Sequence, residues 1–170
     1  IMGEAYIEVK KNAARPFIVN GKDFELQVLG TSFNINSYTD NGTVKATLVE
    51  GSIRLSHGMD SIGIQLRPGE QWVYGGQDGT PRIIRSADIS QVLAWKEKRF
   101  SFNGNIRSIM NEVARWYDVE LKYEGRIPDK ELEGGFTREK ELRKVLEILE
   151  VASGVHFELK GKLLTIRASE

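Results

Sequence analysis

The chain has 170 residues, enough for one ordinary domain or two small ones, and its 40% hydrophobic and 28% charged content is close to globular averages. Its 24 basic and 24 acidic residues balance, which argues against a nucleic-acid-binding surface because such a surface needs excess positive charge. The lack of cysteine excludes disulfides and cysteine nucleophiles, and with two histidines we expect no metal site and no cofactor.

Residues 1–86 alternate between apolar and polar side chains, which is the pattern of half-buried strands. Residues 23–28, 43–48 and 62–66 show it most clearly. Turn sequences recur at short intervals, and Pro68-Gly69 suits a type II turn because proline presets φ and glycine accepts a positive φ. Many short strands at this spacing predict an all-β domain over 1–86, either a sandwich or a pair of stacked sheets.

The pattern changes over residues 87–98, where Ile89, Val92 and Leu93 have the spacing of one helical face. We expect this segment to be a helical linker between two domains. Apolar runs are only a few residues long, so the sequence predicts no membrane span. Because the chain begins with Ile1 and shows no leader pattern, we expect it to be part of a longer protein.

Residues 99–170 contain a repeat with a shift of 36 residues. Seven apolar positions of the first copy recur as apolar positions of the second: Phe100, Ile106, Ile109, Met110, Val113, Val119 and Leu121 match Phe136, Leu142, Val145, Leu146, Leu149, Val155 and Phe157. Their spacing describes an amphipathic helix followed by a strand. With a strand before each helix and a last strand at the end, the sequence predicts a small α+β domain of order β-α-β-β-α-β-β, with both helices on one face of a small sheet.

Residues that favour helix ends support this interpretation. Asn103 or Asn105 is expected to cap the first helix of the repeat, and Thr137 the second. Gly154 stands where the second helix should end.

Few motifs indicate chemistry. Glu131 and Glu133 would project from one face of a strand, as the carboxylate pair of a hydrolase could, but alternating charge on a solvent-facing strand has the same pattern. At Gly30-Thr31, a hydroxyl directly after a glycine can attack the preceding carbonyl in an N-to-O acyl shift. The alternative is a tight bend between a strand ending at Leu29 and a strand starting at Ser32.

The last predicted strand is the candidate partner-binding segment. It consists of Leu163, Leu164, Thr165, Ile166 and Arg167, contains no proline and is rich in residues that favour strands. We expect it to lie at a sheet edge, where unpaired backbone groups recruit a strand from another chain. The alternative is a closing strand that is already paired on both sides.

Several ordered segments resemble a known family. Residues 3–9, 16–19, 28–35, 47–53 and 66–71, with sequences GEAYIEV, PFIV, VLGTSFNI, TLVEGSI and LRPGEQ, resemble the periplasmic FecR domain of FecR-type anti-sigma factors. The later segments AWK, FSF and ARWYDV resemble the small domain that often follows it, which is similar to the signalling module of secretins and TonB-dependent receptors.

The resemblance implies a non-enzymatic relay in cell-surface signalling. Such proteins join a cytoplasmic segment that binds an extracytoplasmic-function sigma factor, one inner-membrane helix and a periplasmic part that binds the signalling domain of a TonB-dependent receptor. Only the periplasmic part has a counterpart in these 170 residues, so we expect sigma-factor contact to be made by a segment outside them. Some relatives are cut at the Gly-Thr bond that matches Gly30-Thr31. The alternative function is a carbohydrate-binding or cell-envelope adhesion module built on the β domain.

Overall fold

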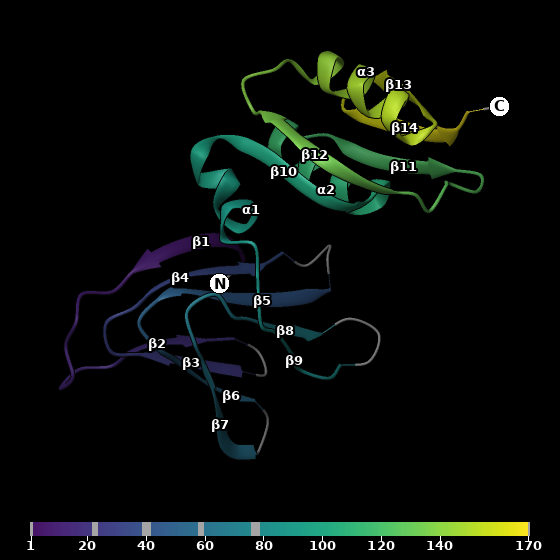
Figure 1. Ribbon diagram of the computed structural model, residues 1–170. Helices are drawn as coiled ribbons and strands as arrows, with labels where there is room; N and C mark the ends of the chain where they lie inside the picture. Colours follow the sequence, from purple (N-terminus) through teal and green to yellow (C-terminus); the bar gives the residue numbers. More distant parts are fainter. Residues whose placement is uncertain (1, 22–23, 39–41, 58–59, 76–78, 170) are drawn as a thin grey trace. The chain divides into compact units, whose positions relative to one another are not determined.

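The computed structural model describes residues 2–21, 24–38, 42–57, 60–75 and 79–169 (Figure 1). The chain forms two compact units, Ile1–Leu93 and Ala94–Glu170. The division falls inside the segment 87–98, which contains the short helix α1 (Ile89–Leu93) and the 3₁₀ helix η2 (Ala94–Glu97). Among the described residues, no helix has the length and apolar character needed to cross a bilayer.

The N-terminal unit consists of two antiparallel sheets, which confirms the predicted all-β domain. The five-stranded sheet has the order β1-β4-β5-β8-β9, with strands Gly3–Glu8, Ser32–Ser37, Thr43–Glu50, Gln71–Gly75 and Arg82–Ile84. The four-stranded sheet has the order β2-β3-β6-β7, with strands Phe17–Asn20, Phe24–Val28, Ile53–His57 and Asp60–Leu66.

Period-two alternation explains why these strands bury one face. In β3, Leu26 and Val28 are buried on one face of the strand, whereas Glu25 on the opposite face is exposed. One core joins side chains from both sheets, including Leu26, Val28, Phe33, Ile35, Ala46, Leu48, Ile53, Leu55 and Trp72. The predicted type II turn is present: Gly69 has φ +84° and the Glu70 amide donates to the Arg67 carbonyl at 2.9 Å.

The C-terminal unit has the predicted order β-α-β-β-α-β-β. After η2 come β10 (Arg99–Asn105), α2 (Ile106–Tyr117), β11 (Glu120–Glu124), β12 (Glu131–Thr137), α3 (Leu142–Ser153), β13 (Val155–Lys160) and β14 (Leu163–Ala168). The helices α2 and α3 have 12 residues each, and their first residues are separated by the period of the repeat.

The expectation of a single small sheet is wrong, because the strands form two. The strands β10 and β12 form a two-stranded sheet in which Phe100 lies opposite its repeat counterpart Phe136. The other sheet has the order β11-β14-β13, with β11 parallel and β13 antiparallel to β14. Each repeat therefore contributes its first strand to one sheet and its second strand to the other.

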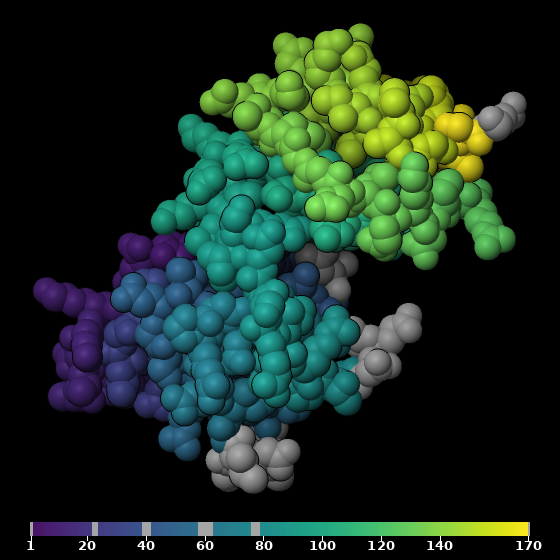
Figure 2. Space-filling model, viewed as in Figure 1, coloured from purple at the N-terminus to yellow at the C-terminus, as the bar shows by residue number. Residues whose placement is uncertain are grey.

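The predicted helix faces form the core of this unit. Buried residues from both helices and both sheets make one cluster: Phe100, Ile106, Ile109, Met110, Val113, Ile127, Leu132, Val145, Leu146, Leu149, Val155, Phe157, Leu164 and Ile166. Figure 2 shows the unit, coloured from teal through green to yellow, as a closely packed body on the face in view.

The helix-end predictions are partly confirmed. Asn105 is the N-cap of α2, and its side-chain oxygen accepts from the Ser108 amide at 3.1 Å. Gly154 ends α3 with φ +71°. The prediction for Thr137 is wrong: this residue still belongs to β12, paired with Arg99, and the N-cap of α3 is Glu141, whose side chain makes no capping hydrogen bond.

The expected edge position of Leu163, Leu164, Thr165, Ile166 and Arg167 is also wrong. These residues belong to β14, the middle strand of its sheet, which is paired with β11 on one side and β13 on the other. The alternation of apolar and polar residues does not show which strands pair with β14. One of its neighbours, β11, lies about 40 residues earlier in the chain, so this pairing depends on the tertiary structure. The open edges of this sheet belong to β11 and β13.

Candidate functional site

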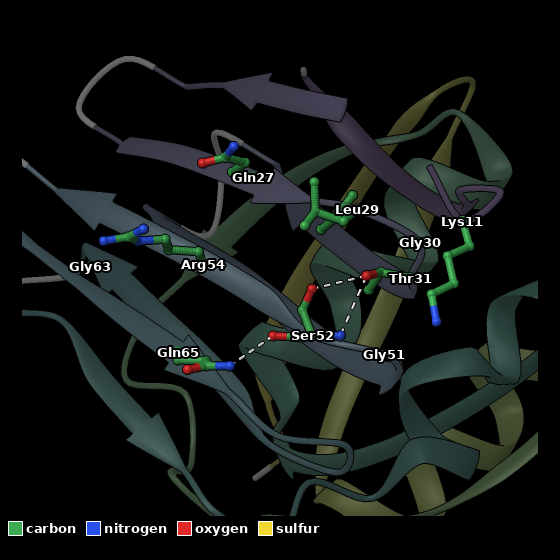
Figure 3. A pocket seen from close by; sticks show the side chains of 11 residues that line it. Lys11, Gln27, Leu29, Gly30, Thr31, Gly51, Ser52, Arg54, Gly63 and Gln65 are labelled. Carbon is green, nitrogen blue, oxygen red and sulfur yellow. Dashed lines mark hydrogen bonds between the residues drawn. The ribbon is translucent and has the colours of Figure 1, made fainter. Parts of the chain in front are cut away.

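Gly30 and Thr31 lie in the bend between β3 and β4. The Thr31 amide donates to the Val9 carbonyl at 3.1 Å, and the Val9 amide donates back to the Thr31 carbonyl at 2.9 Å. The Thr31 side chain is buried, and its hydroxyl donates to the Ser52 carbonyl at 2.9 Å (Figure 3). These bonds tie the bend to residues that follow β1 and to the turn between β5 and β6.

Two glycines are required by the tightness of this bend. A Cβ at Gly30 would stand 2.5 Å from the Lys11 Cα, and a Cβ at Gly51 would stand 2.6 Å from the Gly30 carbonyl oxygen. Gly51 also has φ +92°, a conformation that L-residues with side chains rarely adopt. Close backbone packing therefore explains why a glycine precedes Thr31, and this explanation does not require an acyl shift at the Gly30-Thr31 bond.

The polar partners of Thr31 stabilise its hydroxyl but are not bases. The hydroxyl donates to one backbone group of Ser52 and accepts from another, the amide, at 3.4 Å. The cavity beside the bend is lined by Lys11, Gln27, Val28, Leu29, Gly30, Thr31, Gly51, Ser52, Arg54, Gly63 and Gln65. These residues include no imidazole or carboxylate, the groups that most often take a proton in acyl transfer.

The cavity, with a volume of about 700 Å³, lies against the outer face of the four-stranded sheet. The strand register aligns Gln27, Arg54 and Gln65 in one row across β3, β6 and β7. Figure 3 shows these side chains from neighbouring strands along one surface, with the Gln65 amide donating to the Ser52 hydroxyl at 3.1 Å. Sequence reasoning identified Gly30 and Thr31 but missed this row, because the register that aligns it involves strands far apart in the chain.

In the C-terminal unit, an ion-pair network crosses the three-stranded sheet. Glu124 on β11 contacts Lys122 and Arg167, each at 2.7 Å. Arg167 on β14 also contacts Glu158 on β13 at 3.3 Å, and Glu158 contacts Lys160 at 2.7 Å. Hydrogen bonds from the cations lower the pKa of both carboxyl groups. Arg167, predicted as a partner-binding residue, is thus engaged within its own sheet.

An aromatic cluster surrounds Arg138, a residue that the sequence did not single out. Its guanidinium lies 4.4 Å from the Phe100 ring centre and 4.8 Å from that of Trp116, and Arg138 also pairs with Glu112. The Trp116 ring nitrogen donates to the Arg138 carbonyl at 3.2 Å. Burial raises the pKa of Tyr117, whose ring stacks on Phe100, and the nearby charge of Arg138 opposes this rise.

The two remaining candidate carboxylates lie on a solvent-facing strand. Glu131 and Glu133 are exposed and alternate with buried Leu132 in β12. Among the described residues, no cluster of three or more histidine or acidic side chains could hold a metal ion.

Comparisons with known proteins point to one family. The family described as FecR protein matches residues 1–54, and the family described as FecR, C-terminal, matches residues 99–166. No curated protein matches the chain.

Two crystal structures of a protein described as an anti-sigma factor from Parabacteroides distasonis share the fold. One has a TM-score of 0.87 and the other 0.86, each at 23% identity. Both alignments cover 99% of this chain, and they cover 79% and 78% of the other chains. The fold is therefore one that a solved protein adopts over both units. With both characteristic regions present in order, the chain belongs to the FecR family.

Proposed function

We propose that this chain is the signal-receiving region of an anti-sigma factor. In this account it lies in the periplasm, binds the signalling domain of a TonB-dependent outer-membrane receptor and thereby controls an extracytoplasmic-function sigma factor. The observation that carries the proposal is the match to both FecR regions in their family order. The protein from Parabacteroides distasonis with the same fold supports the sigma-regulator role.

A protein-contact role agrees with the chemistry of the described residues. The cavity beside Thr31 lacks an imidazole or carboxylate, and the exposed pair Glu131 and Glu133 faces solvent on β12. The cavity also lacks an aromatic ring on which a sugar could stack, which disfavours the carbohydrate-binding alternative. We therefore assign no catalysis of an external substrate to this chain.

The open edge of β13 is the best candidate for the receptor contact. In the part of the chain that the structure describes, no strand pairs with the outer side of β13, so a strand of the partner can extend the sheet there. Leu159 on β13 is 44% exposed, and the helix α3, which packs on β13, exposes Ile148 and Val151. Unpaired backbone beside exposed apolar side chains suits strand addition better than β14, which has no free side.

A calorimetric titration with the receptor's signalling domain tests the proposal. The substitution Leu159→Asp should weaken binding about tenfold or more, because it places a charge at the apolar border of the contact. Leu163→Asp is a matched control, since Leu163 is similarly exposed, at 39%, but lies on the central strand. Failure of the unmodified chain to bind the signalling domain would refute the proposed function, and equal weakening by both variants would move the contact away from β13.

A further inference from the structure

Two positively charged side chains line the cavity on the outer face of the four-stranded sheet. Lys11 and Arg54 line the cavity, and no hydrogen bond or ion pair joins either side chain to another described residue. The segment that supplies Lys11, residues 9–16, also carries Lys10 and Arg15 and contains no acidic residue. The residues that line the cavity therefore carry two positive charges and no negative charge, in a chain whose net charge is zero.

The two cations do not converge on one point. Figure 3 shows Lys11 and Arg54 on opposite sides of the hydrogen-bonded pair Thr31 and Ser52. A single phosphate or sulfate needs donors that converge, whereas two separated cations suit an extended ligand with more than one negative group. Between them, Gln27 and Gln65 offer side-chain amides that can both donate and accept, as a peptide backbone requires.

Apolar contacts are available at the same place. Leu29, in the cavity wall, is 46% exposed. Ile18 on the edge strand β2 is 45% exposed and lies opposite Gln27, so it extends the row of Gln27, Arg54 and Gln65. Leucine and isoleucine favour a ligand with side chains over a hydrophilic polysaccharide, and the cavity has no aromatic ring for sugar stacking.

We propose that this cavity binds an extended, acidic peptide segment of a partner protein. Lys11 and Arg54 pair with two separated carboxylates, the glutamines bind the peptide backbone, and Leu29 contacts an apolar side chain. The cavity belongs to the N-terminal unit, so this site is additional to the β13 contact and does not rest on the proposed function.

The conformation of Arg54 offers a test that leaves the charge intact. A Cβ at Gly63 would stand 2.7 Å from Arg54 Nε, so Gly63→Ala displaces the end of this flexible side chain rather than backbone. This variant should weaken peptide binding while keeping every charged residue. A merely diffuse electrostatic attraction would be unaffected by it.

The experiment is a fluorescence-anisotropy titration of the 170-residue protein with a labelled decapeptide of alternating glutamate and threonine. We expect binding that weakens at least about tenfold in Arg54→Glu and in Lys11→Glu, because each reversal replaces an attraction by a repulsion. The matched control is Arg82→Glu, which reverses an exposed charge on β9 of the other sheet and should leave affinity unchanged. Thermal unfolding checks that each variant is folded.

Three further probes separate the alternatives: the same peptide with glutamine for glutamate, trigalacturonic acid and inorganic phosphate. Binding of the glutamate peptide alone supports the proposal. Absence of binding, equal affinity in Arg54→Glu and Arg82→Glu, or stronger binding of trigalacturonic acid or phosphate than of the peptide would each overturn it.

Discussion

Arg138 connects three segments of the C-terminal unit through one side chain. Its Nε donates to the Arg99 carbonyl at 3.0 Å, its guanidinium lies over two rings, and its side chain is only 9% exposed. A planar, delocalised cation can stack and donate in this way, whereas an ammonium cannot. The residue therefore stabilises the approach of the β12–α3 connection to α2 and β10.

The substitution Arg138→Lys should lower the free energy of unfolding by about 1–2 kcal/mol, because it keeps the charge but loses stacking and the bond to Arg99. Arg143→Lys, on the exposed side of α3, is the control and should change stability by less than about 0.5 kcal/mol. Urea unfolding of both variants measures the difference. Equal stability of the two would show that the stacking around Arg138 contributes nothing.

Autoproteolysis at Gly30-Thr31 stays a prediction, and it depends on the hydroxyl of Thr31. In the full-length protein, Thr31→Ala should leave a single intact chain, whereas Thr31→Ser, which keeps the nucleophile, should retain cleavage. Intact-mass spectrometry distinguishes these outcomes. Cleavage at another bond, or an uncut wild-type chain, would leave Thr31 with only the structural role that its bonds to Ser52 provide.

At the scale of elements, the ion-pair network on the three-stranded sheet predicts a pH dependence. The pKa values of Glu124 and Glu158 lie below that of an unperturbed glutamate, 4.5, because cations donate to their charged forms. These carboxylates therefore stabilise the folded state above that pH, and the contribution is lost as the pH falls through their lowered pKa values.

The double variant Glu124→Gln/Glu158→Gln should show a shallower fall of the thermal midpoint between about pH 5 and pH 3 than the wild type. High salt should reduce the difference between them, since the pairs are exposed and screened. Scanning calorimetry at several pH values provides the measurement. Parallel pH profiles for the two proteins would mean that the network does not stabilise the fold.

The local spacing of apolar residues in the sequence was sufficient to predict much of the fold. The faces of α2 and α3 were predictable because residues such as Ile109 and Val145 repeat with helical spacing, and their burial follows from that spacing alone. The position of β14 was not predictable, since a strand's alternation is the same whether it is central or at an edge. The Arg54 row and Arg138 were missed for a related reason: their partners come from distant segments, and a single arginine carries no local signal.

At the scale of the whole molecule, the domain boundary predicts where the chain is vulnerable. Arg85, Lys96 and Lys98 are exposed trypsin sites at or beside residues 87–98, within which the division between the two units falls. Limited trypsin digestion should cut there first and leave a folded fragment that starts around residue 97. Early cutting spread evenly through both units would contradict the assignment of two domains.

The central claim is that this FecR-family chain receives a receptor signal through its C-terminal unit. Hydrogen–deuterium exchange of the chain, with and without the receptor's signalling domain, tests it most directly because added strand pairing protects edge amides. The account predicts slower exchange in 155–160 on binding, with little change in 163–168, whose amides already have partners on both sides of the strand. Unchanged exchange throughout 94–170 in the presence of saturating signalling domain would contradict it.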